Sequence, residues 1–398
     1  MTNQGVAEVP VANLGPVICV VGARPNFMKM APILRAMAAH DPQMPVLLVH
    51  TGQHYDQDMS GRLFEDLGLQ RPDVNLEVGS GTHAIQTAEV MRRFEPVVDA
   101  HAPSCVAVVG DVNSTLACAL VAVKKGIPVV HIEAGLRSYD RTMPEEINRI
   151  LTDQISARLY TTERTAQDNL VREGIPSQQV CFVGNVMIDS VVFGRANARS
   201  AAGTLRACQM DPAVLSGPTG YGVVTLHRPS NVDKAETLRA LLEALAEVAG
   251  RLPLVFALHP RTRSNIDRFG LAHLVDPLRM VLLPPQGYLE MQGLMAGATV
   301  VLTDSGGLQE ETTALGVPCL TLRENTERPI TIEQGTNTLV GRDRATIVAA
   351  VGEILAGHGK RGRLPELWDG HAAERITADL YQWLMHRRAC AAPNSLTT

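Results

Sequence analysis

Two carboxylates in the first half of the sequence stand where general acid–base chemistry would need them. Asp111 follows the apolar segment Cys105–Val109, and Glu133 follows the apolar segment Val129–Ile132. If these segments are neighbouring parallel strands, their carboxyl ends meet at one edge of a sheet, where two carboxylates can share a crevice and move a proton. Asp111 could instead cap the helix that follows, a role that Asn113 could also fill. For Glu133 no structural duty is obvious.

A third carboxylate, Glu145, stands at the expected start of a helix, within the sequence Thr142-Met143-Pro144-Glu145. The threonine and the glutamate have the spacing of a capping box, and proline is common in a first helical turn. A structural role therefore accounts for Glu145 as well as a catalytic role does. A carboxylate at a helix start is placed for catalysis if that start faces the ligand.

An anion site is expected where the apolar segment Val300–Thr303 leads through Asp304–Gly307 (DSGG) directly into a helix. Free backbone N–H groups and the positive end of the helix dipole attract anions there, and the glycines let a diphosphate approach closely. Glu311, one turn into the helix, could accept hydrogen bonds from ribose hydroxyls, and Arg328 adds a candidate cation. The alternative is an ordinary capped turn, which needs neither two glycines nor the acidic residues after them.

Two further segments carry groups that suit an anion. Arg24 and Lys29 flank the start of a helix after Val17–Val21, although this segment lacks the glycine spacing of a Walker A loop. They could equally be two solvated cations. His227 follows Gly222–Leu226 and could stabilise a phosphate or serve as an acid, but a single histidine is more often structural.

Neither a cofactor nor a metal is expected. Gly79–Ala84 matches the G-x-G-x-x-G/A pattern of nicotinamide-binding proteins, but no good strand precedes it. The histidines form no H-x-x-x-H or H-E-x-x-H pattern, and the 7 cysteines form no C-x-x-C pair. Their odd number and apolar surroundings indicate buried free thiols in a reducing compartment.

Short apolar segments alternate with amphipathic ones and must position these groups. The expected strands are Val17–Val21, Val46–His50, Cys105–Val109, Val129–Ile132, Val180–Val183, Gly222–Leu226, Leu254–Leu258, Met280–Leu283, Val300–Thr303 and Cys319–Leu322. The expected helices are Pro25–His40, Asp56–Leu67, Ala84–Ala100, Ser114–Lys124, Glu145–Ser156, Ala235–Ala249, Tyr288–Ala296, Leu308–Leu315 and Arg344–Leu355. Apolar strands that are each followed by a helix indicate parallel sheets covered on both faces. The two series predict an α/β chain with two doubly wound, Rossmann-like domains.

A polar stretch of small residues within 185–213 marks the expected domain boundary. We therefore predict an N-terminal domain at 17–185, a C-terminal domain at 186–370, and flexible tails at 1–16 and 388–398. A last helix, His371–Arg387, could pack on either domain.

Composition narrows the class of protein. The chain has 398 residues and a formal net charge of −5, which argues against nucleic acid or an anionic membrane as the main partner. The N-terminus lacks the basic start and apolar stretch of a signal peptide, and no apolar run reaches about 18 residues. We expect a cytoplasmic protein without a membrane span.

The motifs resemble those of the non-hydrolysing UDP-N-acetylglucosamine 2-epimerases, in the same order, from about residue 17 to residue 385. The matching segments are GARPNFMKMAP, HTGQHYDQDMS, GDVNSTLA, HIEAGLRS, MPEEINR, HRPSN, PPQGYLEMQGLM, TDSGGLQEE and ENTERPI. The resemblance implies a glycosyltransferase-B-like fold with the active site in the interdomain cleft. It also implies a terminal helix that crosses back to the first domain.

The same resemblance assigns roles to particular residues. It implies catalytic roles for Asp111, Glu133, Glu145 and His227. The residues that it places around the UDP-sugar are Arg24, Lys29, Gln286, Met291, Ser305, Gly306, Gly307, Glu311 and Arg328. Some members of the family bind a second substrate molecule as an activator beside residues that match Gln53, Arg228 and His259. The segment His227–Asn231 (HRPSN) departs from the usual family motif, which puts that regulation in question.

The reaction implied is cofactor-free epimerisation at carbon 2 of UDP-N-acetylglucosamine, with UDP eliminated to leave 2-acetamidoglucal and then added back. The product, UDP-N-acetylmannosamine, would supply cell-envelope polysaccharide, and the family precedent is a homodimer. Three alternatives stay open. The first is a 2-epimerase of a UDP-2,3-diacetamido uronic acid, which shares the segment GQHYDQDMS. The others are a hydrolysing epimerase and a nucleotide-sugar glycosyltransferase.

Overall fold

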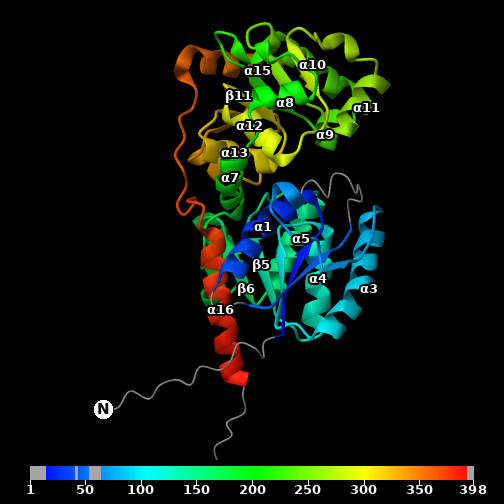
Figure 1. The fold of residues 1–398 in the computed structure, drawn as a ribbon, viewed down its shortest axis with the longest axis vertical. Helices are drawn as coiled ribbons and strands as arrows, with labels where there is room; N and C mark the ends of the chain where they lie inside the picture. Colours follow the sequence, from blue (N-terminus) through cyan, green and yellow to red (C-terminus); the bar gives the residue numbers. More distant parts are fainter. Residues whose placement is uncertain (1–14, 41–43, 53–63, 392–398) are drawn as a thin grey trace, which may run out of the picture. The chain divides into compact units, whose positions relative to one another are not determined.

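The computed structural model describes residues 15–40, 44–52 and 64–391. These residues divide into two compact units. The first unit holds the described parts of Met1–Asp56, Gln70–Val186 and His371–Thr398, and the second holds those of Gln57–Leu69 and Met187–Gly370. In Figure 1 the sequence colours show that the red C-terminal helix belongs with blue and cyan segments from the beginning of the chain.

A parallel sheet of 7 strands forms the centre of the first unit, in the order β3-β2-β1-β4-β5-β6-β7. The strands are β1 (Val17–Val21), β2 (Val46–His50), β3 (Val74–Asn75), β4 (Cys105–Val109), β5 (Val129–Ala134), β6 (Arg158–Thr161) and β7 (Val180–Phe182). Every residue of β1, β4 and β5 is buried, because helices cover both faces of the sheet. The strand order changes direction between β1 and β4, and ligands bind at such a switch point in doubly wound sheets.

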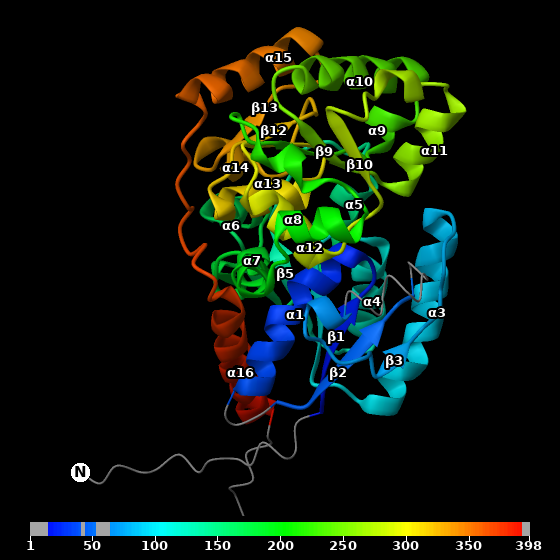
Figure 2. The ribbon, with the colours of Figure 1, turned by 45° about the horizontal axis from the view of Figure 1, so that its top comes forward.

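Helices from both ends of the sequence cover this sheet. They are α1 (Arg24–Ala39), α3 (His83–His101), α4 (Asn113–Lys124), α5 (Pro144–Ile155), α6 (Arg164–Arg172) and α16 (Ala372–Ala391), whereas α7 (Val186–Asn197), which follows β7, belongs to the second unit from Met187 onward. Figures 1 and 2 both show α16 beside α1, in agreement with their packing contacts. Asp379 on α16 accepts hydrogen bonds from Tyr160 Oη (2.7 Å) and Arg158 Nε (2.9 Å) of β6. Helix α16 is therefore anchored to the first sheet.

The second unit repeats the plan with a parallel sheet of 6 strands in the order β10-β9-β8-β11-β12-β13. Its strands are β8 (Gly222–Thr225), β9 (Leu254–Ala257), β10 (Met280–Leu283), β11 (Val300–Thr303), β12 (Cys319–Thr321) and β13 (Asn337–Leu339). Its helices are α8 (Ala201–Ala207), α9 (Pro229–Val232), α10 (Ala235–Ala249), α11 (Pro260–Arg268), α12 (Tyr288–Ala296), α13 (Gly306–Leu315), α14 (Pro329–Glu333) and α15 (Arg344–Glu353). The switch point here lies between β8 and β11.

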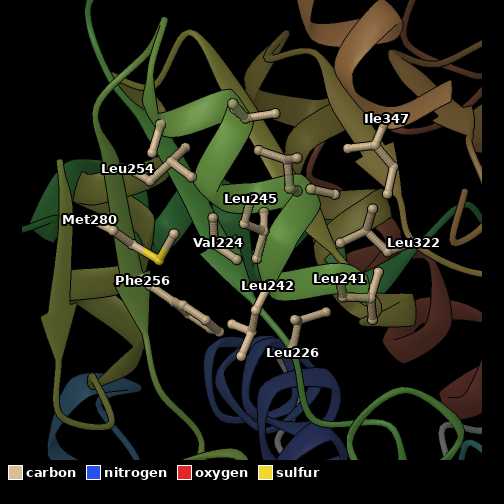
Figure 3. Packing of buried hydrophobic residues seen from close by; sticks show 14 of the residues in the cluster. Val224, Leu226, Leu241, Leu242, Leu245, Leu254, Phe256, Met280, Leu322 and Ile347 are labelled. Atoms are coloured by element: carbon tan, nitrogen blue, oxygen red, sulfur yellow. The ribbon is translucent and has the colours of Figure 1, made fainter. Parts of the chain in front are cut away.

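Alternate residues of each strand enter cores on opposite faces of this second sheet. Val224 and Phe256 pack with α10, while Val223 and Val255 pack with residues of α8 and α12. Figure 3 shows Leu241, Leu242 and Leu245 of α10 directed at the strands, and their spacing of three and four residues places them on one helix face. Figure 2 shows α15 beside α10 on this same side of the sheet.

The expected fold class is confirmed, because both units are parallel-sheet α/β structures. The predictions missed β3, β6 and β13, which are short and carry polar residues. The helix expected at Asp56–Leu67 lies mostly outside the described residues. Within the part of the chain that the structure describes, no helix is both long enough and apolar enough to cross a membrane.

Buried free thiols were also expected, and Cys19, Cys105, Cys118 and Cys319 are buried and unpaired by disulfides. Cys181 and Cys208 are only half-buried, and for Cys390, which is exposed on α16, the expectation is wrong. Burial raises the pKa of the Cys19 thiol to about 12 and that of Cys319 to about 11. Because the thiolate is the reactive form, these cysteines are packing residues.

Candidate active site

A buried ion pair joins two of the predicted site residues at the carboxyl edge of the first sheet. Lys29 Nζ on α1 lies 2.6 Å from Glu133 Oε2 on β5 and 2.7 Å from Oε1. Glu133 has φ = 67°, a left-handed value, at the point where the register between β5 and β6 shifts. Such a conformation costs a non-glycine residue about 1–3 kcal/mol and is typically kept where it directs a side chain to a functional position.

The turn between β4 and α4 lies directly beside this ion pair. Gly110 has φ = +70°, and a Cβ atom on it would stand 3.4 Å from Lys29 Nζ. Asn26 Nδ2 donates to Val109 O (2.9 Å), and Asn26 Oδ1 accepts from Ala23 N (2.9 Å), which joins the end of β4 to the start of α1. The Asn26 side chain thus bridges the two backbone segments at the switch point of the first sheet, directly before Gly110 and Asp111.

Asp111 is held by α5 and does not cap α4. Its carboxylate forms an ion pair with Arg149, and its backbone carbonyl accepts from Asn148 Nδ2 (2.9 Å). The N-cap of α4 is Val112, without a side-chain cap hydrogen bond. The structural alternative for Asp111 is therefore wrong, and its half-buried carboxylate lies at the end of β4, next to β5.

Arg149 also contacts the buried carboxylate of Glu146, with Nη1 2.6 Å from Oε2. Glu146 in turn accepts hydrogen bonds from Ser138 N (3.0 Å), Ser138 Oγ (2.9 Å) and Tyr139 N (2.9 Å). Glu146 and Arg149 thus connect the loop after β5 to Asp111. Sequence reasoning missed both residues, although the i, i+3 spacing of opposite charges in MPEEINR was the available signal.

Glu145 is half-buried in the first turn of α5, where the helix dipole stabilises an anion. The N-cap of α5 is Met143, which makes no side-chain cap hydrogen bond, and Thr142 Oγ1 donates to Asp140 Oδ1 (2.6 Å). The capping box considered for Glu145 is therefore absent. Among the described residues, the Glu145 carboxylate has no hydrogen-bond or ion-pair partner in the structure.

A second buried network stabilises the turns at this edge. His131 on β5 lies with Nδ1 2.6 Å from Asp153 Oδ1 and Nε2 2.8 Å from Gly110 O. Asp153 also accepts from Gly135 N (3.1 Å) and pairs with Arg137 Nη2 (2.7 Å). These contacts fix the backbone immediately before Asp111 and shortly after Glu133.

In the second unit, His227 follows β8 and is paired with Asp304, which follows the neighbouring strand β11. The Nδ1 atom of His227 lies 2.9 Å from Asp304 Oδ1, and the aspartate is fully buried. Burial opposes the charge of Asp304, but the histidine and two backbone N–H groups bind the carboxylate and hold its pKa below the usual range. Sequence reasoning did not assign Asp304 a role.

The predicted anion site is the start of α13. Ser305 is the N-cap and its side chain makes no cap hydrogen bond, so it leaves the first backbone N–H groups of the helix to other acceptors. A Cβ atom on Gly306 would lie 2.5 Å from Glu327 Oε1 and 3.9 Å from Arg228 Nη2. A larger residue at this position would have to displace the Glu327 carboxylate, and the Arg228 guanidinium stands next to the helix start.

Arginines surround the buried carboxylate of Glu327 beside this helix start. Arg323 Nη2 lies 2.9 Å from Glu327 Oε2, and Arg228 Nη2 lies 3.2 Å from Oε1. Burial opposes the charge of Glu327, but Arg323, Arg328 and Arg228 together hold its pKa well below the usual range. Arg328 Nε also pairs with Glu310 Oε1 (2.9 Å) on α13. The structure therefore joins Arg328 to α13, the helix that begins at Gly306 and Gly307.

The remaining predicted residues are more scattered. Gln286 follows β10, two strands from β8, and donates to Pro284 O (2.7 Å). Met291 packs against the hydrophobic core under α12, and Glu311 is buried on α13. Arg24 is half-buried at the start of α1.

The three residues expected beside an activator are Gln53, Arg228 and His259. Gln53 lies outside the described residues. His259 is exposed, caps α11 by accepting from Arg261 N (3.2 Å), and has its ring centroid 5.9 Å from that of His227. Arg228, through Glu327, belongs to the anion site itself.

Two other features lie away from these edges. Among the described residues, no group of three or more His, Cys, Asp or Glu side chains is arranged to hold a metal ion. A cavity of about 330 Å³ lies at the opposite edge of the second sheet, where Thr299, Pro318 and Thr336 precede β11, β12 and β13. It is separate from His227 and the start of α13.

The sequence and the structure are similar to those of known UDP-N-acetylglucosamine 2-epimerases. A family model described as UDP-N-acetylglucosamine 2-epimerase matches residues 36–381. The UDP-N-acetylglucosamine 2-epimerase of Methanocaldococcus jannaschii is 41% identical over 360 residues, covering 90% of this chain and 96% of that protein. The UDP-2,3-diacetamido-2,3-dideoxy-D-glucuronate 2-epimerase of Pseudomonas aeruginosa is 42% identical over 335 residues, covering 83% and 90%. A crystal structure of Methanocaldococcus jannaschii UDP-GlcNAc 2-epimerase in complex with UDP-GlcNAc and UDP matches with a TM-score of 0.80 at 38% identity, covering 92% of this chain and 99% of that chain.

Proposed function

The chain belongs to the UDP-N-acetylglucosamine 2-epimerase family, and we propose that it interconverts UDP-N-acetylglucosamine and UDP-N-acetylmannosamine without a cofactor. The enzyme is an isomerase that acts as a 2-epimerase. The observation that supports this substrate and mechanism best is the presence of two kinds of site, one in each unit. Carboxylates gather at the carboxyl edge of one sheet, and an anion site with arginines stands at the carboxyl edge of the other.

The proposed reaction proceeds by elimination and re-addition. A carboxylate takes the proton from carbon 2 while the bond from carbon 1 to the UDP oxygen breaks, and the electron pair forms a carbon 1–carbon 2 double bond. The products of this step are 2-acetamidoglucal and UDP. A proton then returns to carbon 2 from the opposite face as UDP adds back to carbon 1. No electrons are gained or lost overall, so no redox cofactor is required.

The carbon 2 proton is only weakly acidic, so its removal must accompany departure of UDP. Negative charge therefore grows on the diphosphate in the transition state, where prepositioned donors are most effective. The backbone N–H groups at Gly306, together with Arg328 and His227, would supply those donors. Ser305, Gly307, Glu311, Gln286 and Met291 of the second unit, with Arg24 and Lys29 of the first, complete the residues that we propose for the UDP-sugar.

We assign the proton transfers to the first unit. Asp111 and Glu133 are proposed to act nearest carbon 2, with Glu145 in support. Both of the first two carboxylates are already paired, with Arg149 and Lys29 respectively, which fixes their orientation. Catalysis benefits from such fixed groups because little reorganisation is needed when the substrate reacts.

One observation favours a second substrate. The Pseudomonas aeruginosa relative, which is 42% identical, is named for a UDP-2,3-diacetamido uronic acid. The second candidate function is therefore 2-epimerisation of that sugar nucleotide by the same steps. In either case we propose a cytoplasmic homodimer that supplies precursors of cell-envelope polysaccharide.

Proton NMR in deuterium oxide with UDP-N-acetylglucosamine, and no added cofactor, tests the proposal. UDP-N-acetylmannosamine with deuterium at carbon 2 is the expected product. Free N-acetylmannosamine with UDP would identify a hydrolysing enzyme instead. An unchanged spectrum would overturn the first substrate, and the same experiment with the diacetamido uronic acid nucleotide would then test the second.

A further inference from the structure

Asp304 is surrounded by hydrogen-bond donors. Its carboxylate accepts from His227 N (3.1 Å), Arg228 N (3.0 Å) and Asn231 Nδ2 (3.1 Å), and it lies 2.9 Å from His227 Nδ1. The side chain is fully buried, and each of the backbone and amide partners can only donate. Asp304 is therefore an acceptor at every contact.

This arrangement has a consequence for the protons of the histidine ring. Because Asp304 Oδ1 is an acceptor, Nδ1 of His227 must carry a hydrogen whenever the two atoms are bonded. The hydrogen of the neutral ring is then on Nδ1, which leaves Nε2 as the nitrogen available to a ligand. The His227 side chain is 37% exposed, so its ring is accessible while its partner is not.

We infer that Asp304 is a positioning residue that fixes the hydrogen of His227 on Nδ1 and holds Nε2 for the leaving diphosphate. This inference rests on the proposed function, since the diphosphate is assigned there to the start of α13. When the ring is also protonated on Nε2, that nitrogen donates a hydrogen bond to the departing oxygen. Asp304 does not contact the substrate itself.

The position of Asp304 in the fold supports this role. Strands β8 and β11 are hydrogen-bonded neighbours, and Thr225 Oγ1 and Thr303 Oγ1 at their ends are 2.6 Å apart. Asp304 follows Thr303 directly and precedes Gly306, the first residue of α13, by two positions. One buried carboxylate thus binds His227 and stands two positions before the helix start that is proposed to hold the diphosphate.

A merely structural role makes a different prediction. If Asp304 served only to bind the backbone of the turn after β8, its removal would loosen residues 227–231 without selecting a ring nitrogen. The location of the ring hydrogen therefore separates the two roles. His259, whose ring is 5.9 Å from His227, is the neighbouring titratable side chain that must be followed in parallel.

The first experiment uses the unmodified protein. Histidines are labelled with ¹⁵N, and two-bond ¹H–¹⁵N correlation spectra are recorded as the pH is raised until the rings are neutral. His227 is assigned by loss of its signals in His227→Gln, and His259 by loss in His259→Gln. We expect neutral His227 to carry its hydrogen on Nδ1. A hydrogen on Nε2 would overturn the inference, whether or not the protein has epimerase activity.

The second experiment compares Asp304→Asn with Asp276→Asn, an exposed aspartate with a side chain 52% accessible. We expect Asp304→Asn to lower kcat about 100-fold or more with KM changed less than about threefold, and to move the ring hydrogen to Nε2, as loss of the orienting carboxylate does in other His–Asp pairs. The control should change neither. Equal loss of kcat and rise of KM, with the hydrogen still on Nδ1, would overturn the inference. If Asp304→Asn does not fold, the spectrum of the unmodified protein still decides.

Discussion

The guanidinium of Arg149 joins the carboxylate of Asp111 to that of Glu146, so that two side chains of α5, Arg149 and Glu146, connect the end of β4 with the loop after β5. Arg149 and Glu146 are both buried, whereas Asp111 is partly exposed with 23% of its side chain accessible. The exposed end of this chain of charges is the carboxylate that we propose to act on the substrate. Its orientation is therefore set from inside the protein.

Arg149→Ala should lower turnover by about 100-fold, because a carboxylate displaced by about 1 Å loses that much activity. UDP affinity should stay unchanged, since the groups proposed to bind UDP phosphates belong to the second unit. Steady-state kinetics and isothermal titration with UDP measure the two effects. Added guanidinium ion should restore part of the activity, and Arg92→Ala, an exposed arginine on α3, should behave like the unmodified enzyme. An equal loss of UDP affinity would contradict the assignment.

Asp111→Asn should reduce the rate of deuterium incorporation at carbon 2 by about 10²- to 10⁴-fold, the usual range for loss of a general acid or base. The amide keeps the shape of the side chain, so the protein should remain folded and bind UDP normally. Deuterium exchange followed by NMR gives the rate. Asp99→Asn, at an exposed position on α3 with a side chain 60% accessible, serves as the matched control. Near-normal exchange in Asp111→Asn would remove Asp111 from the proposed mechanism.

Gly306→Ala should weaken UDP binding at least tenfold. The new methyl group would lie 2.5 Å from Glu327 Oε1 and must displace the carboxylate or the start of α13. Overpacking of this kind costs about 1–3 kcal/mol of stability. The matched change Gly352→Ala on α15 meets its nearest atom at 3.7 Å and should be neutral or stabilising by up to about 1 kcal/mol. Unchanged UDP affinity in Gly306→Ala would show that the diphosphate does not approach this helix start.

Stability should fall in acid as Glu327 takes up a proton. The pKa of Glu327 in the folded protein is below its ordinary value of 4.5, so its contribution is fully present above that value and is lost as the pH falls below it. The pKa of Asp304 is likewise below its ordinary value of 3.8 and adds to the loss at lower pH. Urea unfolding at pH 7, 4.5 and 3.5 measures the effect.

The variant Glu327→Gln isolates this contribution. It should be less stable than the unmodified protein at pH 7, because three arginines lose their common partner, and its stability should depend less on pH below 4.5. Glu353→Gln, an exposed position with a side chain 70% accessible, should leave the pH profile unchanged. Identical acid profiles for Glu327→Gln and the unmodified protein would contradict the role of Glu327.

The sequence predicted those elements whose burial leaves a strong apolar pattern. Strands β1 and β4 are five buried apolar residues each, and both were located with their correct bounds. β6 was missed because it begins with Arg158, which reaches Asp379 at the far end of the chain. β13 was missed because its first residue is the polar Asn337. This side chain is buried in the structure, where hydrogen bonds to Gln309 and Thr321 satisfy it. A polar residue whose hydrogen-bond partners lie far away in the sequence cannot be distinguished from a loop residue by the local sequence pattern.

The same limit applies to the site. Asp111 and Glu133 were identified from their places after apolar segments, because neighbouring parallel strands end at one edge. Their cations, Arg149 and Lys29, come from elsewhere in the chain, and the Lys29–Glu133 pair spans 104 residues. The left-handed backbone of Glu133 could not be predicted either, because glycine is the residue that usually indicates this conformation and position 133 is a glutamate. Spacing along the chain therefore located these carboxylates but not the contacts that orient them.

The anchoring of α16 to α1 and β6 affects how the protein is made. The first unit contains the beginning and the end of the chain, and the whole of Met187–Gly370 is synthesised between them. At ordinary rates of translation that interval lasts roughly 10–40 seconds. During this time Arg158 and Tyr160 lack the Asp379 carboxylate as a hydrogen-bond acceptor, and the surface of α1 that packs against α16 is exposed to solvent. The second unit can fold on the ribosome as soon as it emerges, whereas the first unit can be completed only after α16 has been synthesised.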